Sequence, residues 1–245
     1  AVLNSEMSGN VVDLCPVGAL TSKPNAFAAR SWEYRSTPSV DVLDGCGPSI
    51  KVDTAKGEVM RVQPRLNEDV NEEWISDKTR YAVDGLKRQR LDTPLLRKGG
   101  GLEPVTWQEA LTVAADKLGS ASAAEVGALA GSLVEVEALV CLKDLINGLG
   151  STSTTACSPL SADLRSSYSF NATIAGIEQA DALLLVGSNP RVEAPLVNAR
   201  IRKMVRHASL PVASVGPKAD LTFAYDHLRA GAQALSALAD GSPPC

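Results

Sequence analysis

Histidine is rare in this sequence of 245 residues, and long apolar runs are missing. Only His207 and His227 are present, which excludes a zinc site built from three histidines. The best apolar stretch, residues 182–186, has the length of a strand and falls far short of the roughly 18 residues that a membrane-spanning helix needs. The 24 basic and 28 acidic residues give a net charge of −4, so the basic surface typical of nucleic-acid binders is lacking as well. We therefore expect no nucleic-acid partner and no membrane span.

The cysteines lack the Cys-x-x-Cys spacing of many metal sites. Their odd number argues against a disulfide framework and fits a reducing compartment. A 4Fe–4S cluster is usually held by four thiolates, several of them close together in the sequence. The chain alone therefore lacks the ligands to assemble such a cluster in the usual way. The five cysteines are Cys15, Cys46, Cys141, Cys157 and Cys245.

The amino terminus lacks an initiator methionine and the features of a signal peptide, since AVLNSEMSGN carries neither a basic region nor an apolar core. We therefore expect a processed chain or a fragment of a longer one. No nucleophile is paired with a base and no nucleophile elbow is visible, so hydrolysis is not favoured. With 44% apolar and 21% charged residues, the composition is that of a globular protein.

Three zones follow one another along the chain, and they predict domains at residues 1–35, 36–104 and 105–245. The first zone is too short to build a core of its own, so it must pack against something else. We expect the second zone to be a small β unit and the third to belong to an α/β domain.

The second zone carries strand patterns. Short apolar stretches at 39–43, 50–52 and 59–62, the last two separated by the turn Thr-Ala-Lys-Gly, predict antiparallel strands. The polar segment 67–90 that follows is dense in charges of both signs. From residue type alone, a solvated or interface loop with a short helix is favoured there.

The third zone alternates between helical and strand patterns. Thr106 and Glu109 form a capping box, and the apolar residues after them follow helical spacing. Residues 126–130 predict a strand, and a second helix then runs from Val136 to a stop signal at Gly148.

A parallel sheet is predicted from the alternation that continues to the end of the third zone. The stretch 182–186 is apolar throughout, which predicts a strand buried on both faces. A helix at 193–207 and a strand at 212–215 follow it. About three parallel strands are present, fewer than the five or six of a typical sheet. The predicted fold class is α/β, with a small antiparallel β unit followed by part of a doubly wound parallel sheet.

The sharpest local signal is Cys15, which is followed by Pro16, Val17, Gly18 and Ala19. In ferredoxin-like segments the last cluster cysteine is commonly followed by proline, which fixes the backbone after the thiolate, and small residues let the chain approach the cluster closely. The alternative is a buried structural cysteine beside a turn. The local pattern leaves both interpretations open.

The other cysteines carry weaker signals. Cys46 lies between glycines and between two predicted strands, with no partner cysteine nearby, so a free thiol in a tight turn is favoured over a cluster loop. Cys141 sits in an apolar helix and is expected to behave as a small core residue. Cys157 and Cys245 lack the spacing of metal ligands.

The turn Gly-Ser-Asn-Pro at residues 187–190 lies between a predicted strand and a predicted helix, where α/β sheets bind anionic ligands. It matches neither the dinucleotide-binding nor the phosphate-binding glycine motif, so local features favour an ordinary turn. The cations on or near the following helix are expected on a solvated or subunit-facing surface rather than around a nucleotide. They are Arg191, Arg200, Arg202, Lys203 and Arg206.

Longer motifs resemble one family closely. The sequence GNVVDLCPVGALTSKP at residues 9–24 resembles the large iron–sulfur subunit of NADH:ubiquinone oxidoreductase, respiratory complex I. The resemblance continues in collinear order over essentially the whole chain, at residues 71–80, 84–91, 187–195, 198–203 and 225–228.

This resemblance implies an electron-transfer subunit of the peripheral arm of the complex. In that family the amino-terminal part holds one 2Fe–2S cluster and two 4Fe–4S clusters, which pass electrons from flavin toward quinone. Cys15 matches the fourth ligand of one 4Fe–4S cluster, and the other three cysteines lie upstream of it in the family. They are absent from this sequence, so either the chain is a segment of a longer subunit or another chain donates them.

The remainder resembles the molybdopterin oxidoreductases, whose small β region carries four cysteines for another 4Fe–4S cluster. The matching stretch here, residues 40–47, keeps only Cys46, and residues 77–80 stand where the later cysteine is expected. The resemblance therefore implies no cluster at this place and no bound molybdopterin. The turn 187–190 is then expected to be structural.

These observations predict a subunit, or part of one, that relays electrons from NADH and flavin toward ubiquinone, with Cys15 as its metal ligand and no catalytic activity of its own. The expected partners are other peripheral-arm subunits, including the flavin-bearing module and the segment or chain with the remaining cysteines. Segment 67–90 is an expected contact surface. The expected location is the matrix side of the mitochondrial inner membrane, or the cytoplasmic face of a bacterial membrane. A structural scaffold without a cluster and a fragment of an active molybdopterin enzyme are the alternatives.

Overall fold

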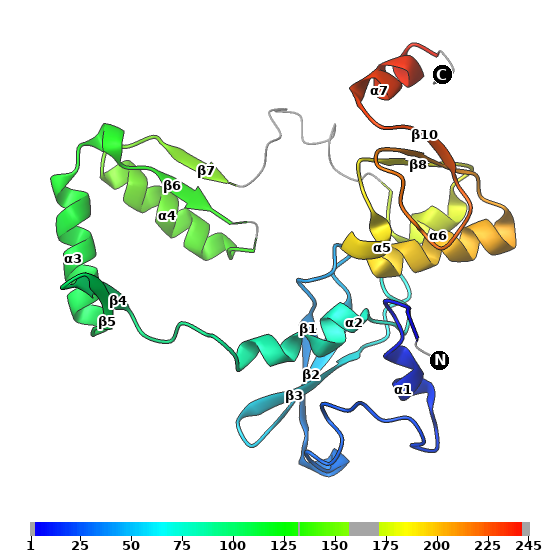
Figure 1. The fold of residues 1–245 in the computed structure, drawn as a ribbon, viewed down its shortest axis with the longest axis horizontal. Helices are drawn as coiled ribbons and strands as arrows, with labels where there is room; N and C mark the ends of the chain where they lie inside the picture. The colour runs from blue at the N-terminus through cyan, green and yellow to red at the C-terminus, as the bar shows by residue number, and fades with distance from the viewer. Residues whose placement is uncertain (1–2, 132, 157–171, 242–245) are drawn as a thin grey trace. The chain divides into compact units, whose positions relative to one another are not determined.

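The computed structural model describes residues 3–131, 133–156 and 172–241. The chain divides into two compact units (Figure 1). Unit 1 comprises Ala1–Lys87 together with Phe170–Cys245, and unit 2 comprises Arg88–Ser169, whose helices and strands are drawn in green. Unit 1 is therefore assembled from two stretches that are far apart in the sequence, with the whole of unit 2 between them.

The first stretch of unit 1 forms a small antiparallel sheet, as the sequence predicts. Its strands pair in the order β1-β2-β3. β2 and β3 are joined by Lys56 and Gly57, both in the left-handed region with φ of 53° and 79°, which suits a two-residue hairpin turn. The elements are α1 (Asn10–Leu14), η1 (Ser31–Glu33), β1 (Arg35–Val40), β2 (Ser49–Ala55), β3 (Glu58–Pro64), α2 (Asp77–Tyr81) and η2 (Ala82–Leu86).

Ile75 connects this sheet to the segment that leads into α2. Its side chain is fully buried and packs against Ile50 of β2 and Val62 of β3. Burial of an isoleucine side chain stabilises the fold by about 1.5–3 kcal/mol, which is enough to hold α2 against the sheet. The amino-terminal half of unit 1 thus has a small core at the junction of β2, β3 and the approach to α2.

Polar side chains complete the same junction. Asn71 accepts a hydrogen bond from the main-chain N–H of Ser49 at 2.9 Å and donates one to the carbonyl of Arg65 at 3.1 Å. Asn71 is buried, and Ser76 is fully so. The prediction of a solvated or interface segment over 67–90 is therefore wrong for its centre, although the predicted short helix is present as α2.

The second stretch of unit 1 forms a three-stranded parallel sheet in the order β10-β9-β8. Its elements are η5 (Ala175–Gln179), β8 (Leu183–Val186), α5 (Pro190–Glu193), α6 (Pro195–Ala208), β9 (Val212–Val215), β10 (Asp226–Arg229) and α7 (Ala232–Ala239). The core between sheet and helices consists of Ile177, Leu185, Ile201, Leu210, Val212 and Leu221. With the antiparallel sheet before it, this arrangement confirms the predicted α/β fold class.

Strand β8 differs from its prediction. Leu185 points into the core that contains Ile201 of α6. Side chains alternate along a strand, so Leu184 and Val186 point to the opposite face, where they are 47% and 49% exposed. The prediction of burial on both faces is wrong among the described residues, because an apolar sequence does not specify what covers each face of a strand.

Unit 2 contains a β-hairpin, two longer helices and a pair of parallel strands. Its elements are β4 (Leu95–Lys98), β5 (Gly101–Pro104), α3 (Trp107–Ser120), η3 (Ala123–Glu125), β6 (Ala128–Ala130), α4 (Val136–Gly148) and β7 (Thr154–Ala156). The hairpin turns at Gly99 and Gly100, both with positive φ. A Gly-Gly pair is a hairpin signal, but this hairpin is not among the elements predicted from the sequence. The described parallel strands form two separate sheets, β6-β7 in unit 2 and β8-β10 in unit 1.

Only half of the predicted capping box at the start of α3 forms. The Thr106 hydroxyl accepts a hydrogen bond from the main-chain N–H of Glu109 at 3.3 Å. The Glu109 carboxylate turns instead to the ammonium group of Lys98 at 2.6 Å. Helix α3 therefore begins at the predicted place, with an ion pair to the hairpin instead of the reciprocal cap.

Candidate functional site

Cys15 directly follows α1, at the position where the helix ends. Its backbone is extended, with φ of −76° and ψ of 105°, as expected for a residue that precedes a proline. The thiol is free and partly exposed. The apolar residues around it in the sequence are exposed as well, with Leu14 at 58% and Val17 at 81%. Cys15 is therefore partly exposed in the described structure rather than buried in a core, and its role as a ligand stays a prediction.

Main-chain N–H groups of the loop after Cys15 lie near its sulfur. Hydrogen bonds from the N–H groups of Leu20 and Val17, with smaller contributions from Ala19 and Gly18, lower the pKa of the Cys15 thiol. Gly18 has a φ of 67°, so the turn that aims these groups at the sulfur uses a left-handed residue. Donors directed at a sulfur stabilise its thiolate, which is the form that binds metals. This loop therefore fits an iron-bound cysteine.

Helix α1 is fastened to α2 at its amino-terminal end. The main-chain N–H of Gly9 and the hydroxyl of Ser8 both donate to the Asp77 carboxylate, at 2.6 Å and 2.5 Å. In return, the main-chain N–H of Asp77 donates to the carbonyl of Glu6 at 2.7 Å. A Cβ on Gly9 would lie 2.7 Å from the Arg80 Cδ atom, so the close approach requires glycine. The two helices are thus interlocked through main chain as well as side chains.

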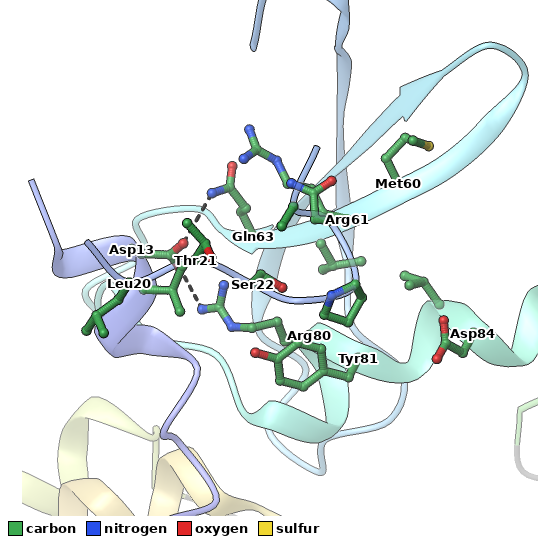
Figure 2. Close-up of a pocket in the computed structure, with 16 residues that line it drawn as sticks. Asp13, Leu20, Thr21, Ser22, Met60, Arg61, Gln63, Arg80, Tyr81 and Asp84 are labelled. Atoms are coloured by element: carbon green, nitrogen blue, oxygen red, sulfur yellow. Dashed lines mark hydrogen bonds and ion pairs between the residues drawn. The ribbon is translucent and has the colours of Figure 1, made fainter. Parts of the chain in front are cut away.

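Asn10 and Arg80 continue this contact along α1 toward Cys15. The Asn10 amide donates to the carbonyl of Ile75 at 2.7 Å and accepts from its N–H at 3.2 Å. The Arg80 guanidinium donates to Asn10 Oδ1 at 2.9 Å and to Asp13 Oδ2 at 2.6 Å. Figure 2 shows Arg80 reaching from α2 toward Asp13. The sheet therefore supports α2, and α2 supports α1. The candidate ligand Cys15 directly follows α1.

A cavity of about 210 Å³ lies between the loop after Cys15 and the sheet (Figure 2). Residues 20–26 form one wall, β3 a second, and α2 with η2 a third. On the β3 side, Arg61 pairs with Asp53 at 2.7 Å and lies over the ring of Tyr34. The lining mixes polar and apolar side chains and contains neither cysteine nor histidine, so it offers no thiolate or imidazole to a metal.

Cys46 occupies a different environment from Cys15. It lies in a turn where the main-chain N–H of Gly45 donates to the carbonyl of Glu193 at 2.9 Å. Burial, and then the neighbouring Asp44 carboxyl, raise the pKa of the Cys46 thiol. A protonated, half-buried thiol between acidic groups is a poor iron ligand. The favoured interpretation of a free thiol in a tight turn is therefore the one that the structure supports.

Of the three remaining cysteines, the structure describes only Cys141. Cys141 is exposed on α4, so the prediction of a core residue is wrong. Cys157 and Cys245 lie outside the described residues. Within the described ranges, no group of three or more histidine, cysteine, aspartate or glutamate side chains lies close enough together to hold a metal ion.

The turn 187–190 is followed directly by Arg191, which forms ion pairs inside unit 1. Gly187 takes a positive φ of 63°, and Pro190 begins α5. Arg191 pairs with Glu6 at 2.7 Å and with Asp220 at 2.6 Å. A side chain bound to two carboxylates is not free to grip a nucleotide, which agrees with the expectation of an ordinary turn.

The prediction of a solvated or subunit-facing surface is wrong for Arg200 of α6, which is buried, whereas Lys203 on the same helix is exposed. Arg200 donates to Glu178 at 3.0 Å and to the carbonyl of Glu68 at 2.8 Å. Lys203 pairs with Glu72 at 3.0 Å and also with Glu178. These contacts join the two stretches of unit 1, so Arg200 and Lys203 stabilise the unit itself.

Sequence reasoning missed the residues that hold α1, the helix that Cys15 follows. Asn10 and Arg80 lie 70 positions apart, and Asp77 lies 68 positions from its partner Gly9, so no local pattern pairs them. The available signal for these contacts is the long motif at 71–80, whose residue types alone favour a solvated or interface segment. Its burial and its contacts with α1 explain why it carries so many specific polar side chains.

Three family models match consecutive parts of the chain. A ferredoxin-like domain of NADH-quinone oxidoreductase subunit 3 matches residues 1–21, and the 4Fe-4S domain of NADH-ubiquinone oxidoreductase NDSU1/NuoG-like proteins matches residues 34–84. The molybdopterin oxidoreductase model matches residues 90–244, which is more than half of the chain. The predicted domain limits at 35 and 104 stay a prediction.

Individual relatives show the same relationship. The sequence is 55% identical over 248 residues to the mitochondrial NADH-ubiquinone oxidoreductase 78 kDa subunit of Candida albicans, covering 98% of this chain. It is 50% identical to the mitochondrial NADH dehydrogenase [ubiquinone] iron-sulfur protein 1 of Solanum tuberosum, covering 99% of this chain. The mitochondrial 78 kDa subunit of Neurospora crassa is 52% identical, with 98% of this chain covered. The chain spans about a third of the length of these relatives, between 33% and 34%.

The matches confirm the resemblance that the motifs indicate, and they extend it beyond those motifs. Both the iron–sulfur models and the relatives' names point to the same respiratory enzyme. The chain therefore belongs to the molybdopterin oxidoreductase family, and along almost its whole length it resembles the large iron–sulfur subunit of NADH:ubiquinone oxidoreductase.

Proposed function

We propose that this chain is an electron-transfer iron–sulfur subunit of complex I, or a part of that subunit, in the peripheral arm that relays electrons from NADH and flavin toward ubiquinone. The observation that carries the proposal is the partly exposed Cys15, whose thiol pKa is lowered first by the main-chain N–H groups of Leu20 and Val17. The matches to iron–sulfur families over residues 1–21 and 34–84 support it.

Cys15 binds one iron of a 4Fe–4S cluster as a thiolate. The other three thiolates come from a segment upstream of this sequence or from another chain. When bound, such a cluster accepts and releases one electron at a time at a potential that hydrogen bonds to sulfur and solvent exposure adjust. The N–H groups of Val17 and Leu20 stabilise negative charge on the Cys15 sulfur, which favours the reduced state of the cluster.

The proposal assigns no cluster to the region of Cys46 and no molybdopterin to the turn 187–190. Cys46 is the single cysteine in the stretch that matches the 4Fe-4S domain model, and its raised pKa disfavours the thiolate. Arg191 beside the turn is bound to Glu6 and Asp220. These two places therefore serve the scaffold that holds Cys15.

Its partners are then other subunits of the peripheral arm, including the flavin-bearing module, and nucleic acid is not among them. We assign catalysis to the whole NADH:ubiquinone reductase and no catalytic group to this chain. The proposed location is the matrix side of the mitochondrial inner membrane, or the cytoplasmic face of the membrane in a bacterium. Among the described residues, no helix has the length and apolar character needed to cross a bilayer.

Replacement of Cys15 by serine in the intact complex tests the proposal. We expect low-temperature EPR to show the loss or alteration of one 4Fe–4S signal, and iron analysis to show a matching loss of iron. Cys46→Ser is the matched control, because it removes a thiol from the same unit and is expected to leave the spectrum unchanged. An unchanged spectrum in Cys15→Ser would refute the ligand assignment.

Two other functions stay as alternatives, each with an observation in its favour. A scaffold without a cluster is favoured by the exposed apolar residues of unit 2, such as Trp107 at 68% and Leu129 at 71%, which suit contacts with other proteins. An active molybdopterin enzyme is favoured by the family match over 90–244. The Cys15→Ser spectrum decides the first alternative, and molybdenum analysis of the purified protein decides the second.

A further inference from the structure

We propose that Arg80 is a positioning residue for Cys15, and that its guanidinium determines the direction in which α1 presents the sulfur to the cluster. The inference rests on the proposed function, in which Cys15 binds iron. Arg80 itself belongs to α2, and its hydrogen bonds go to α1 rather than to the sulfur. Its role is therefore exerted through α1.

The guanidinium holds both ends of a very short helix. Its Nη2 atom donates to Asn10 Oδ1 at 2.9 Å and to Asp13 Oδ2 at 2.6 Å. These are the first and the fourth residues of α1, which has five residues. A helix of that length is not stable by itself, because too few hydrogen bonds form to offset the cost of nucleation. Its direction depends on the contacts that fix it from outside.

Those contacts are unequally distributed along α1. Asp77 and Ile75 hold the amino-terminal end, through Gly9 and Asn10. Nearer to Cys15, Asp13 is held by Arg80 at 2.6 Å and, more weakly, by the Gln63 amide at 3.2 Å. Arg80 thus makes the shorter of the two contacts with the part of the helix that leads into the ligand.

Arg80 is itself held firmly enough to act as a fixed point. Its side chain is only 6% exposed, and its Nε atom is buried without a partner among the described residues. Helix α2 begins at Asp77, directly after its N-cap Ser76, which is fully buried and whose hydroxyl accepts a hydrogen bond from the N–H of Thr79 at 3.2 Å. A side chain locked by burial and by a capped helix supports a ligand more rigidly than a surface arginine does.

The test compares Arg80→Gln with Asp13→Ala in the cluster-loaded complex. The two variants break the same contact from opposite sides and change the charge in opposite directions. If Arg80 positions the sulfur, both variants broaden the EPR features of the cluster and lower its spin content per complex. If charge alone matters, the midpoint potential shifts in opposite directions in the two variants while the line shapes stay as in the wild type, and the inference is overturned.

Arg80→Lys and Arg61→Gln serve as matched comparisons. Lysine keeps the charge but has a single nitrogen in place of the fork, so it is expected to restore the line shape only partly. Arg61→Gln removes another arginine–aspartate pair of the same unit, Arg61 with Asp53, without touching α1, and is expected to leave the spectrum unchanged. A broadened spectrum in Arg61→Gln would mean that general destabilisation, and not positioning, explains the effect.

Cys15→Ser separates this inference from the proposed function. An unchanged spectrum in Cys15→Ser removes the proposed function, and the inference with it. A lost signal in Cys15→Ser together with wild-type spectra in both Arg80→Gln and Asp13→Ala overturns the inference alone. Asp13 is 24% exposed, so Asp13→Ala remains decisive if Arg80→Gln does not assemble.

Discussion

The main-chain N–H of Gly9 donates to the Asp77 carboxylate at 2.6 Å, and this contact brings α1 so close to α2 that no Cβ fits between them. The residue before helix α1 is therefore specified by a neighbour 68 positions later in the chain. The candidate ligand Cys15 follows Gly9 by six positions. Its placement thus depends on a helix contact that is sensitive to a single methyl group.

Gly9→Ala is expected to destabilise the protein by about 1–3 kcal/mol, since the added Cβ overlaps both Asp77 and the buried side chain of Arg80. Chemical denaturation of wild type and variant measures the difference. Gly85→Ala is the control, because a Cβ at Gly85 meets nothing within 4 Å, and a change below about 0.5 kcal/mol is expected there. Equal stabilities of Gly9→Ala and the wild type would contradict the observed helix contact.

Asn71→Ala is expected to cost about 1–3 kcal/mol, because the variant leaves the buried N–H of Ser49 without its acceptor. Loss of the donor to the Arg65 carbonyl adds to the effect. Thermal unfolding measures the change. Asn25→Ala provides a comparison at a polar contact that is only partly buried, with the Tyr34 hydroxyl, and we expect it to cost less. A larger loss in Asn25→Ala than in Asn71→Ala would argue against the buried role of Asn71.

The two described thiols of unit 1, Cys15 and Cys46, are expected to differ in reactivity in the cluster-free protein. The N–H groups of Leu20 and Val17 lower the pKa of Cys15, so its thiolate persists to lower pH than that of an ordinary cysteine. Burial and Asp44 raise the pKa of Cys46, so that thiol stays protonated at neutral pH. Iodoacetamide at pH 7 should therefore label Cys15 well before Cys46, as peptide mass spectrometry can show. Unfolding should abolish the difference, and equal labelling rates in the folded protein would disprove the contrast.

Glu72 gives a pH dependence of stability. Partial burial raises the pKa of this carboxyl, but the hydrogen bond and charge of Lys203 and the charge of Arg200 outweigh burial, and the net pKa is lowered. A lowered carboxyl pKa contributes stability above the unfolded value of about 4.3, and that contribution is lost as the pH falls through the folded value. Glu72→Gln should cost about 0.5–1 kcal/mol at pH 7 and much less at pH 3. The same loss at both pH values would show that charge is not the cause.

The small β unit and the position of Cys15 could be predicted from the sequence, because period-2 patterns, turn glycines and a Cys-Pro pair are local signals. The interlock of α1 with α2 could not, since Asn10, Asp77 and Arg80 acquire their meaning only when distant segments meet. Strong polarity in residues 71–80 was interpreted as solvation, whereas the amides and hydroxyls there replace water by bonding to one another and to the main chain.

The exposed face of β8 illustrates a second limit. Leu184 and Val186 are as apolar as Leu185, yet only Leu185 packs against α6. Hydrophobicity shows that a strand avoids water, but it does not identify the element that covers each of its faces. For the same reason Cys141, in an apolar stretch, was predicted to be buried and is exposed.

Arg191 binds Glu6, 185 positions earlier in the chain, and also holds Asp220. Unit 1 consequently cannot finish folding while its carboxyl-terminal stretch is still inside the ribosome. Residues 88–169 leave the ribosome in the meantime, before the second stretch of unit 1 can meet the first. The contact of Arg191 with Glu6 can therefore form only after the whole intervening segment has been synthesised.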